Sequence, residues 1–172
     1  MGKRWESPTI SYWVSDGRLE WPVEWGAYVW SASGANVRLV RAKSRSAAQV
    51  VFVAKQIPEG SSEAGLTELK AYGNTIKSAY VGLRLSLDPY QLALVATHEL
   101  GHVIGLDHDD RGCSIMNSWL AVDHPFMCAT PPNGKWWCRL LTANDVAGAI
   151  ALYGGRPATP KQPVYCPRAS QH

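Results

Sequence analysis

Residues 98–109 of this chain read HELGHVIGLDHD, a run that brings three imidazoles and a carboxylate within reach of one metal ion. On an α-helix, side chains four positions apart lie on one face, separated by about 6 Å along the axis. His98 and His102 can therefore bind the same ion, and a zinc ion suits imidazole ligands in this arrangement. Glu99 follows the first histidine directly, where a general base can take a proton from water at the metal.

The second half of the same stretch predicts a third ligand. Gly105 follows His102 by three positions and can end the helix in a left-handed conformation that other residues resist. The chain can then turn back and bring His108 to the same ion. Because these residue types at this spacing are hard to assemble by chance, the sequence predicts one catalytic zinc site with three histidine ligands.

The extended pattern HExxHxxGxxH resembles that of the metzincin zinc endopeptidases. Residues 113–117 read CSIMN, which resembles the Met-turn of that family, with Met116 as the methionine beneath the metal. Residues 5–14 and 141–154 resemble the first strand and the last helix of a matrixin-like catalytic domain. Asp109, directly after the third histidine, is similar to the adamalysin pattern. The resemblance favours a buried acceptor that steadies the Met-turn over a solvated loop carboxylate.

The resemblance implies a zinc-dependent endopeptidase, in which Glu99 takes a proton from the metal-activated water and later passes it to the leaving amine. Two alternatives stay open: a catalytically silent, zinc-containing peptide-binding module, and a zinc hydrolase that is not a protease. Glu99 argues against the first and the Met-turn against the second. Besides zinc, calcium stays open as a cofactor, because its carbonyl and carboxylate ligands leave little trace in a sequence.

Large apolar residues after the Met-turn are candidates for lining the pocket that receives the side chain beyond the cut bond. They are Trp119, Leu120, Phe126, Trp136 and Trp137. For any one of them, ordinary core packing is the stronger alternative. The strand expected before the active-site helix would bind an extended peptide by β-augmentation. The expected partner is therefore a protein or peptide substrate with an apolar side chain after the cut.

Strand-like and helix-like segments follow one another as in an α+β domain. Residues rich in β-branched and aromatic side chains predict strands at 9–14, 37–42, 49–54, 66–72 and 80–87. Apolar spacing predicts helices at about 22–33 and 89–104. The expected fold is metzincin-like: a mixed, twisted β-sheet packed on two long helices, with an irregular C-terminal subdomain that ends in a helix.

The expected helix ends carry recognisable caps. Asp88, followed by Pro89 and with Gln91 three positions on, predicts the start of the active-site helix. Thr142, with Asp145 able to reach back, predicts the start of the last helix. We expect one catalytic domain over residues 1–172. Its upper subdomain would cover about 1–105 and its lower subdomain about 106–172, with a proline-rich tail from about 155 to 172.

Charge and hydropathy exclude several classes of function. The net charge of +3 is too small an excess for a nucleic-acid-binding protein, so no nucleic-acid partner is expected. No apolar run approaches the roughly 20 residues needed to span a bilayer. The N-terminus lacks the apolar core of a signal peptide, and we interpret the chain as the mature domain of an extracellular protein that acts as a monomer.

The four cysteines are an even number, which is typical of two disulfides formed in an oxidising compartment. Four cysteines allow three pairings, and free buried thiols are the alternative. We favour Cys128 with Cys138, which would close a local loop. Cys113 with Cys166 would then tie the tail to the Met-turn. The absence of a CxxC pair argues against a second zinc site.

Overall fold

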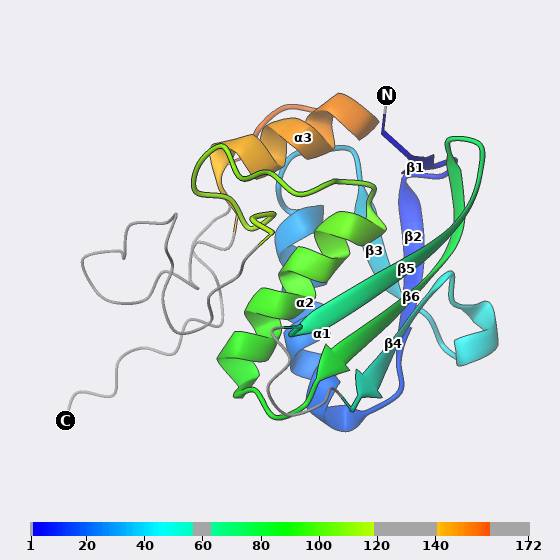
Figure 1. The fold of residues 1–172 in the computed structure, drawn as a ribbon. Helices are drawn as coiled ribbons and strands as arrows, with labels where there is room; N and C mark the ends of the chain where they lie inside the picture. The colour runs from blue at the N-terminus through cyan, green and yellow to red at the C-terminus, as the bar shows by residue number, and fades with distance from the viewer. Residues whose placement is uncertain (1, 57–62, 119–140, 159–172) are drawn as a thin grey trace.

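The computed structural model describes residues 2–56, 63–118 and 141–158. Its described part is a mixed six-stranded β-sheet with two long helices packed on one face (Figure 1). The strands are β1 (Arg4–Trp5), β2 (Thr9–Val14), β3 (Arg38–Arg41), β4 (Val50–Lys55), β5 (Gly65–Tyr72) and β6 (Thr75–Arg84). The expected α+β fold, with a mixed sheet packed against helices, is thereby confirmed.

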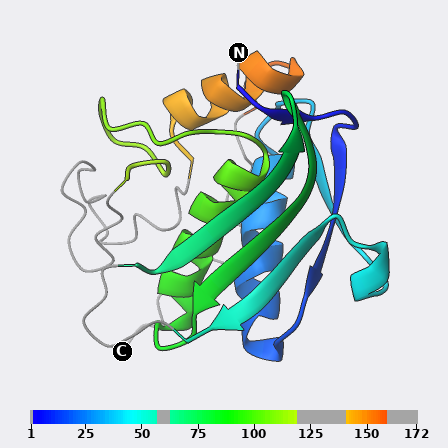
Figure 2. The ribbon, with the colours of Figure 1, turned by 45° about the vertical axis from the view of Figure 1, so that its right-hand side comes forward.

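The sheet has the order β1-β6-β4-β2-β3, and β5 pairs with β6 on the other side. All neighbouring strands run parallel except β5, which is antiparallel to β6. Inward-facing residues of the parallel strands, such as Ile10 and Phe52, are fully buried, as a parallel sheet beneath helices requires. β5 is left as an edge strand beside the active-site helix, as Figure 2 shows.

Helices α1 (Glu20–Ser31) and α2 (Pro89–Val103) lie side by side on the same face of the sheet (Figures 1 and 2). Gly26 allows the close approach, because a Cβ there would lie 2.9 Å from the side chains of Leu100 and Thr97. The indole Nε1 of Trp30 donates a hydrogen bond of 2.8 Å to the carbonyl of Thr97. The core between sheet and helices therefore fixes α2, which carries the first two histidines.

A third helix, α3 (Ala143–Tyr153), lies near the C-terminal end of α2 and the N-terminal segment (Figure 1). The last carbonyls of α2 lack partners within the helix. The Nε1 of Trp5 donates to the Val103 carbonyl at 2.7 Å, and the hydroxyl of Tyr153 donates to the Ile104 carbonyl at 2.8 Å. Side chains from the N-terminal segment and from α3 thus satisfy the end of the active-site helix.

The sequence placed most elements within two residues of their observed bounds, with β6 as the main exception. It was expected at 80–87 and instead runs from Thr75 to Arg84, because Gly73 makes a tight turn with φ of +57° and lets β5 and β6 pair as a hairpin. The two-residue strand β1 and the short 3₁₀ turns η1 (Gly17–Leu19) and η2 (Arg45–Ala47) were not expected.

Two further expectations concern the chain as a whole. Within the described part of the chain, no helix combines the length and the hydropathy that spanning a membrane requires. The division into subdomains at Gly105 stays a prediction, since residues 119–140 of the lower part and residues 159–172 of the tail lie outside the described residues.

Candidate active site

Helix α2 begins where the sequence predicts it, at a capping box. The carboxylate of Asp88 accepts hydrogen bonds from the backbone N–H groups of Tyr90 and Gln91, at 2.8 and 2.9 Å. The side chain of Gln91 accepts one of 3.1 Å from the N–H of Asp88. These bonds satisfy N–H groups that would otherwise lack partners in the first turn, so the start of the helix that carries the site is fixed locally.

Three imidazole nitrogens converge at one point. The Nε2 of His102 lies 3.0 Å from the Nε2 of His98 and 3.2 Å from the Nε2 of His108. Nitrogens that bind one tetrahedral zinc ion at 2.0–2.1 Å stand about 3.3 Å apart. The spacing of the three rings therefore fits a single zinc ion.

The outer nitrogens of two rings decide which tautomer is present. The Nδ1 of His98 lies 2.6 Å from the carbonyl of Ile115, and the Nδ1 of His102 lies 2.8 Å from the carbonyl of Leu106. A carbonyl only accepts, so each Nδ1 carries the proton and each Nε2 presents its lone pair. Lone pairs that face one another at 3.0 Å repel unless a cation lies between them, so the donor set fits Zn²⁺.

Burial keeps the first two ligands neutral. Desolvation, together with a smaller contribution from the charge of a protonated His102, lowers the pKa of His98 from 6.5 to about 4. Burial likewise lowers the pKa of His102. Metal binding requires unprotonated imidazoles, so both rings are ready to bind metal at neutral pH without first losing a proton.

The turn predicted at Gly105 is present and brings the chain back to the metal. Gly105 has φ of +99°. Its N–H donates to the carbonyl of His102 and the N–H of Leu106 donates to that of Gly101, both at 2.9 Å. This pair of bonds is a Schellman motif. A Cβ on Gly105 would also lie 1.9 Å from the carbonyl oxygen of Lys3, so no other residue fits here.

Glu99 lies beside the histidines and is almost entirely buried, with 4% of its surface exposed. Its Oε2 accepts a hydrogen bond of 2.6 Å from the hydroxyl of Thr67 on β5. Desolvation raises the pKa of Glu99 from 4.5 to about 7, although the bond from Thr67 acts in the opposite direction. A carboxyl with a pKa near neutral is suited to both taking and giving a proton.

Met116 lies beneath the helix that carries the histidines. It is 2% exposed, and a Cβ added to Gly101 would stand 2.2 Å from its sulfur. The turn around Met116 is held by Asn117, whose side-chain amide donates to the carbonyls of Asp109 and Gly112, at 2.7 and 2.8 Å. The Met-turn expected from the sequence is therefore packed directly against the residue that precedes His102.

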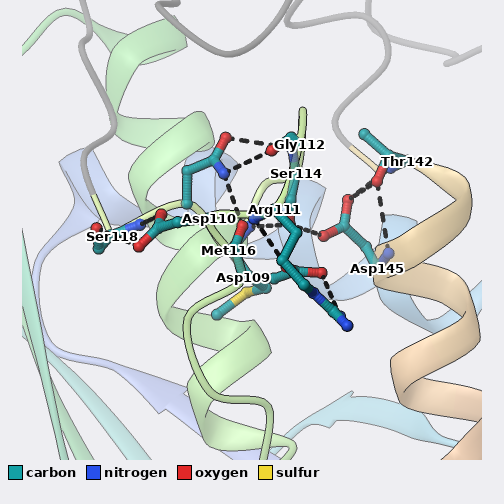
Figure 3. A network of polar contacts seen from close by, with 10 residues as sticks. Asp109, Asp110, Arg111, Gly112, Ser114, Met116, Ser118, Thr142 and Asp145 are labelled. Carbon is teal, nitrogen blue, oxygen red and sulfur yellow. Dashed lines mark hydrogen bonds and ion pairs between the residues drawn. The ribbon is translucent and has the colours of Figure 1, made fainter.

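A buried carboxylate on α3 also supports this turn, as Figure 3 shows. Asp145 is 3% exposed and accepts hydrogen bonds from the hydroxyl of Ser114 and from the N–H of Ile115, the latter at 3.1 Å. It also accepts from the N–H and the hydroxyl of Thr142, at 2.6 and 2.7 Å. Since the Ile115 carbonyl accepts from His98, Asp145 is two hydrogen-bonded steps from a metal-site imidazole.

The side chain of Asp109 differs from its expected role. Within the described part of the chain, its carboxylate is bonded by Arg111, with Nε at 2.8 Å and Nη2 at 3.0 Å, rather than by the Met-turn. The backbone of Asp109 makes the link instead, because its N–H donates to the Met116 carbonyl at 2.8 Å. The expected contact of this carboxylate with the Met-turn is not made within the described residues, because both of its oxygens accept hydrogen bonds from the guanidinium of Arg111.

A cleft of about 680 Å³ runs past these residues. One wall is the edge strand β5, and the floor is α2 with His98, Glu99 and His102. The loop at His108 and the N-terminal residues Gly2 and Lys3 also line it. The histidines and Glu99 thus face a space that an extended peptide could enter.

The five candidate pocket residues Trp119, Leu120, Phe126, Trp136 and Trp137 lie outside the described residues, and so do Cys128, Cys138 and Cys166. Of the cysteines, Cys113 lies within them, and it is disulfide-bonded. The disulfide pairing and the pocket therefore stay predictions.

Sequence reasoning missed several residues that shape the site. Gly101 carried a readable signal, because a glycine inside a helix costs about 1 kcal/mol relative to alanine and usually has a packing reason. Asp145 was expected only as part of a helix cap. Gly65 and Thr67 carried no signal, since their contact with Glu99 joins positions more than thirty residues apart.

Comparison with known proteins gives concordant results. Residues 61–154, more than half of the chain, match the model of the matrixin family, peptidase family M10. The chain is 35% identical over 74 residues to matrix metalloproteinase-27 of Tupaia belangeri. The aligned part is 43% of this chain and 12% of that protein. The chain therefore spans only a small part of this relative's length. The family match over residues 61–154 contains all three histidines.

Proposed function

The chain belongs to the matrixin family, and from this premise we propose that it is a zinc-dependent endopeptidase that cuts peptide bonds in protein substrates. One observation carries the proposal. The Nε2 atoms of His98 and His108 lie 3.0 and 3.2 Å from the Nε2 of His102. All three rings and the buried carboxylate of Glu99 line one open cleft.

The three histidines would hold one zinc ion, with Met116 packed beneath α2 and Gly105 turning the chain towards His108. A bound zinc ion would supply Lewis acidity, which makes a water nucleophilic near neutral pH and polarises a peptide carbonyl. The carbonyls of Ile115 and Leu106 keep two of the rings in the tautomer that zinc needs. Calcium binding remains an open proposal.

Glu99 would move the proton. Its carboxylate takes a proton from the attacking water and later gives it to the leaving amine, so the amine departs neutral. In the metal-free protein, desolvation raises the pKa of the carboxyl to about 7, and a zinc ion bound beside it would favour the ionised form that acts as the base. A carboxyl of ordinary pKa would be a weaker base towards the proton of the attacking water.

The substrate would lie along β5. This strand pairs with β6 alone among the described strands, so its other edge has backbone groups available for an extended peptide. Side-chain preference after the cut would come from the segment after Met116, with Trp119, Leu120, Phe126, Trp136 and Trp137 as proposed lining residues. An apolar side chain is the expected choice at that position.

We further propose that the protein is secreted and acts as a monomer. Matrix metalloproteinases are generally secreted, and the disulfide at Cys113 fits an oxidising compartment. The favoured pairing of Cys113 with Cys166 would anchor the tail near the Met-turn.

The test is hydrolysis of a peptide library by the zinc-loaded protein, with cut sites identified by mass spectrometry. Wild type is expected to cut internal bonds, and a chelator to stop it. Glu99→Gln is expected to lower kcat by roughly 10²–10⁴-fold while zinc stays bound at one ion per chain. Glu6→Gln, which changes a carboxylate that is 84% exposed and lies outside the cleft, is the matched control. A wild type that binds zinc and peptides without cutting would contradict the proposal.

A further inference from the structure

Thr67 makes a direct polar contact with the proposed general base. Its Oγ1 lies 2.6 Å from Oε2 of Glu99 and 3.3 Å from the backbone carbonyl of the same residue. Both acceptors lie on α2, whereas Thr67 lies on the edge strand β5. The shorter contact is the stronger one, and a hydroxyl that donates to a carboxylate makes a charge-assisted bond.

Gly65, two positions earlier on β5, has no side chain and so leaves room for the same carboxylate. A Cβ at this position would stand 2.5 Å from Oε1 of Glu99 and 2.8 Å from its Cγ. Because side chains alternate along a strand, residues 65 and 67 face the same side and approach Glu99 together. One oxygen of the carboxylate is thus bonded by Thr67 and the other lies against bare backbone.

We propose that Thr67 is a positioning residue, which holds Oε2 of Glu99 and leaves Oε1 to exchange the proton with water. This inference rests on the proposed function and deepens it. Glu99 has three rotatable side-chain bonds, so without a partner its carboxylate could turn away from the histidines. The hydroxyl of Thr67 fixes one oxygen, and the missing side chain at Gly65 leaves the space that the other oxygen occupies.

The arrangement also ties the base to the substrate. β5 is the strand along which the peptide would lie, and the same strand holds Glu99.

The experiment compares three variants of the zinc-loaded protein. Thr67→Val removes the hydroxyl and keeps the shape, Thr67→Ser keeps the hydroxyl, and Thr75→Val makes the same exchange at the far end of the hairpin. We expect Thr67→Val to lower kcat by about 10- to 100-fold with KM and zinc content unchanged. Thr67→Ser is expected to recover most of the rate, and Thr75→Val to match wild type.

A spectroscopic readout tests the contact without turnover. In protein labelled with ¹³C at the glutamate carboxyls, Thr67→Val should move the Glu99 carboxyl resonance, assigned by its absence in Glu99→Gln. Thr75→Val should leave it in place.

The outcomes separate the two proposals. A wild type that cuts peptides, together with a Thr67→Val variant of unchanged kcat and unchanged Glu99 resonance, overturns this inference alone. The inference also fails if Thr67→Ser is as slow as Thr67→Val, because the hydroxyl is then not the cause. A change in KM alone would assign Thr67 to substrate binding instead. A wild type that cuts nothing overturns the proposed function, and the role of Thr67 in catalysis falls with it.

Discussion

The helical half of the site, α2, and the loop half, residues 105–118, are ordered by different kinds of interaction. In the helical half, backbone periodicity places His98 and His102 on one face, and the capping box at Asp88 fixes where the helix begins. The loop half contains no helix or strand within residues 105–118. Its shape comes from side chains that bond to backbone, above all Asn117 and Asp145.

The difference shows which part of the metal site depends on distant sequence. The helical half takes its shape from its own residues and from the core beneath it, with Trp5 and Tyr153 bonding to its last carbonyls. The loop half needs a carboxylate from α3, some thirty positions further along. The two halves meet where the Ile115 carbonyl accepts from His98 and where Met116 packs against Gly101. Damage to the loop half should therefore reach a ligand on the helix.

The largest effect is expected from Asp145→Ala, which removes the carboxylate of α3 that bonds to the loop half. The variant leaves the buried N–H of Ile115 and the hydroxyl of Ser114 without their acceptor. We expect the free energy of unfolding to fall by about 3 kcal/mol or more, and zinc affinity to fall by about 10- to 100-fold because His98 loses its orientation. Urea denaturation and competition with a chelator measure the two effects.

Asn144→Ala is the matched control for this variant, because Asn144 is the exposed neighbour of Asp145 on the same helical turn. It should change neither quantity appreciably. An Asp145→Ala protein with wild-type zinc affinity would show that the loop half does not position His98.

The next largest effect is the pH dependence of folded stability that Glu99 in the helical half causes. In metal-free protein, burial raises the pKa of Glu99 from 4.5 to about 7, so folded stability is lost as the pH rises through that window. Glu99→Gln removes this loss. Near pH 8 the variant should be more stable than wild type by about 3 kcal/mol, and near pH 4 the two should be equal. Urea denaturation at a series of pH values in the presence of chelator measures the difference.

The titration of His98 changes folded stability with pH in the opposite direction to Glu99. Asp109 in the loop half provides the control. Because the pKa of His98 falls to about 4, stability from this group is lost as pH falls below 6.5. Wild type should therefore show partial cancellation between about pH 4.5 and 6.5. Asp109→Asn should have the opposite sign to Glu99→Gln, because Arg111 lowers the pKa of Asp109. A difference between wild type and Glu99→Gln that does not vary with pH would contradict the assignment.

Gly101→Ala tests the contact between the halves. The new Cβ would stand 2.2 Å from the sulfur of Met116. Overpacking of this kind costs about 1–3 kcal/mol, and the better helix propensity of alanine offsets up to about 1 kcal/mol of it. Gly112→Ala, at a site with no atom within 4 Å of the new Cβ, should be neutral. The midpoint temperatures of thermal unfolding of the two variants measure this cost. Equal midpoints would mean that Met116 moves aside without cost.

The smallest effect is expected from Arg111→Ala. Arg111 is 87% exposed and pairs with Asp109 on the surface of the loop half. Exposed ion pairs contribute little and are screened by salt. The midpoint of thermal unfolding should fall less than in Gly101→Ala, and the difference from wild type should vanish in molar salt. A large, salt-insensitive loss would mean that this pair, rather than Asn117 and Asp145, holds the loop.

The parts of the site that follow local rules could be predicted from the sequence. Helix α2 was expected at 89–104 and is observed at Pro89–Val103, with its capping box in place. The cap of α3 at Thr142, with Asp145 reaching back, was also expected and is confirmed. The left-handed turn at Gly105 was also predictable, because the signal for a helix end lies within a few residues of sequence.

The rest depends on contacts between distant segments, which spacing does not reveal. Asp145 was recognised as a cap, but its bonds to Ser114 and Ile115 require α3 to lie against the loop. Thr67 reads as an ordinary strand residue until β5 is placed beside Glu99. The surroundings of Asp109 were not predicted, because both oxygens of its carboxylate pair with Arg111 two positions later.

The most direct test of the account is a crystal structure of the zinc-loaded protein, with the metal located by anomalous scattering at the zinc edge. We predict one ion at the site, bound at about 2.0–2.1 Å by the Nε2 atoms of His98, His102 and His108, with Glu99 beside it but not bound to it. An ion bound elsewhere, or by fewer than these three imidazoles, would contradict the account.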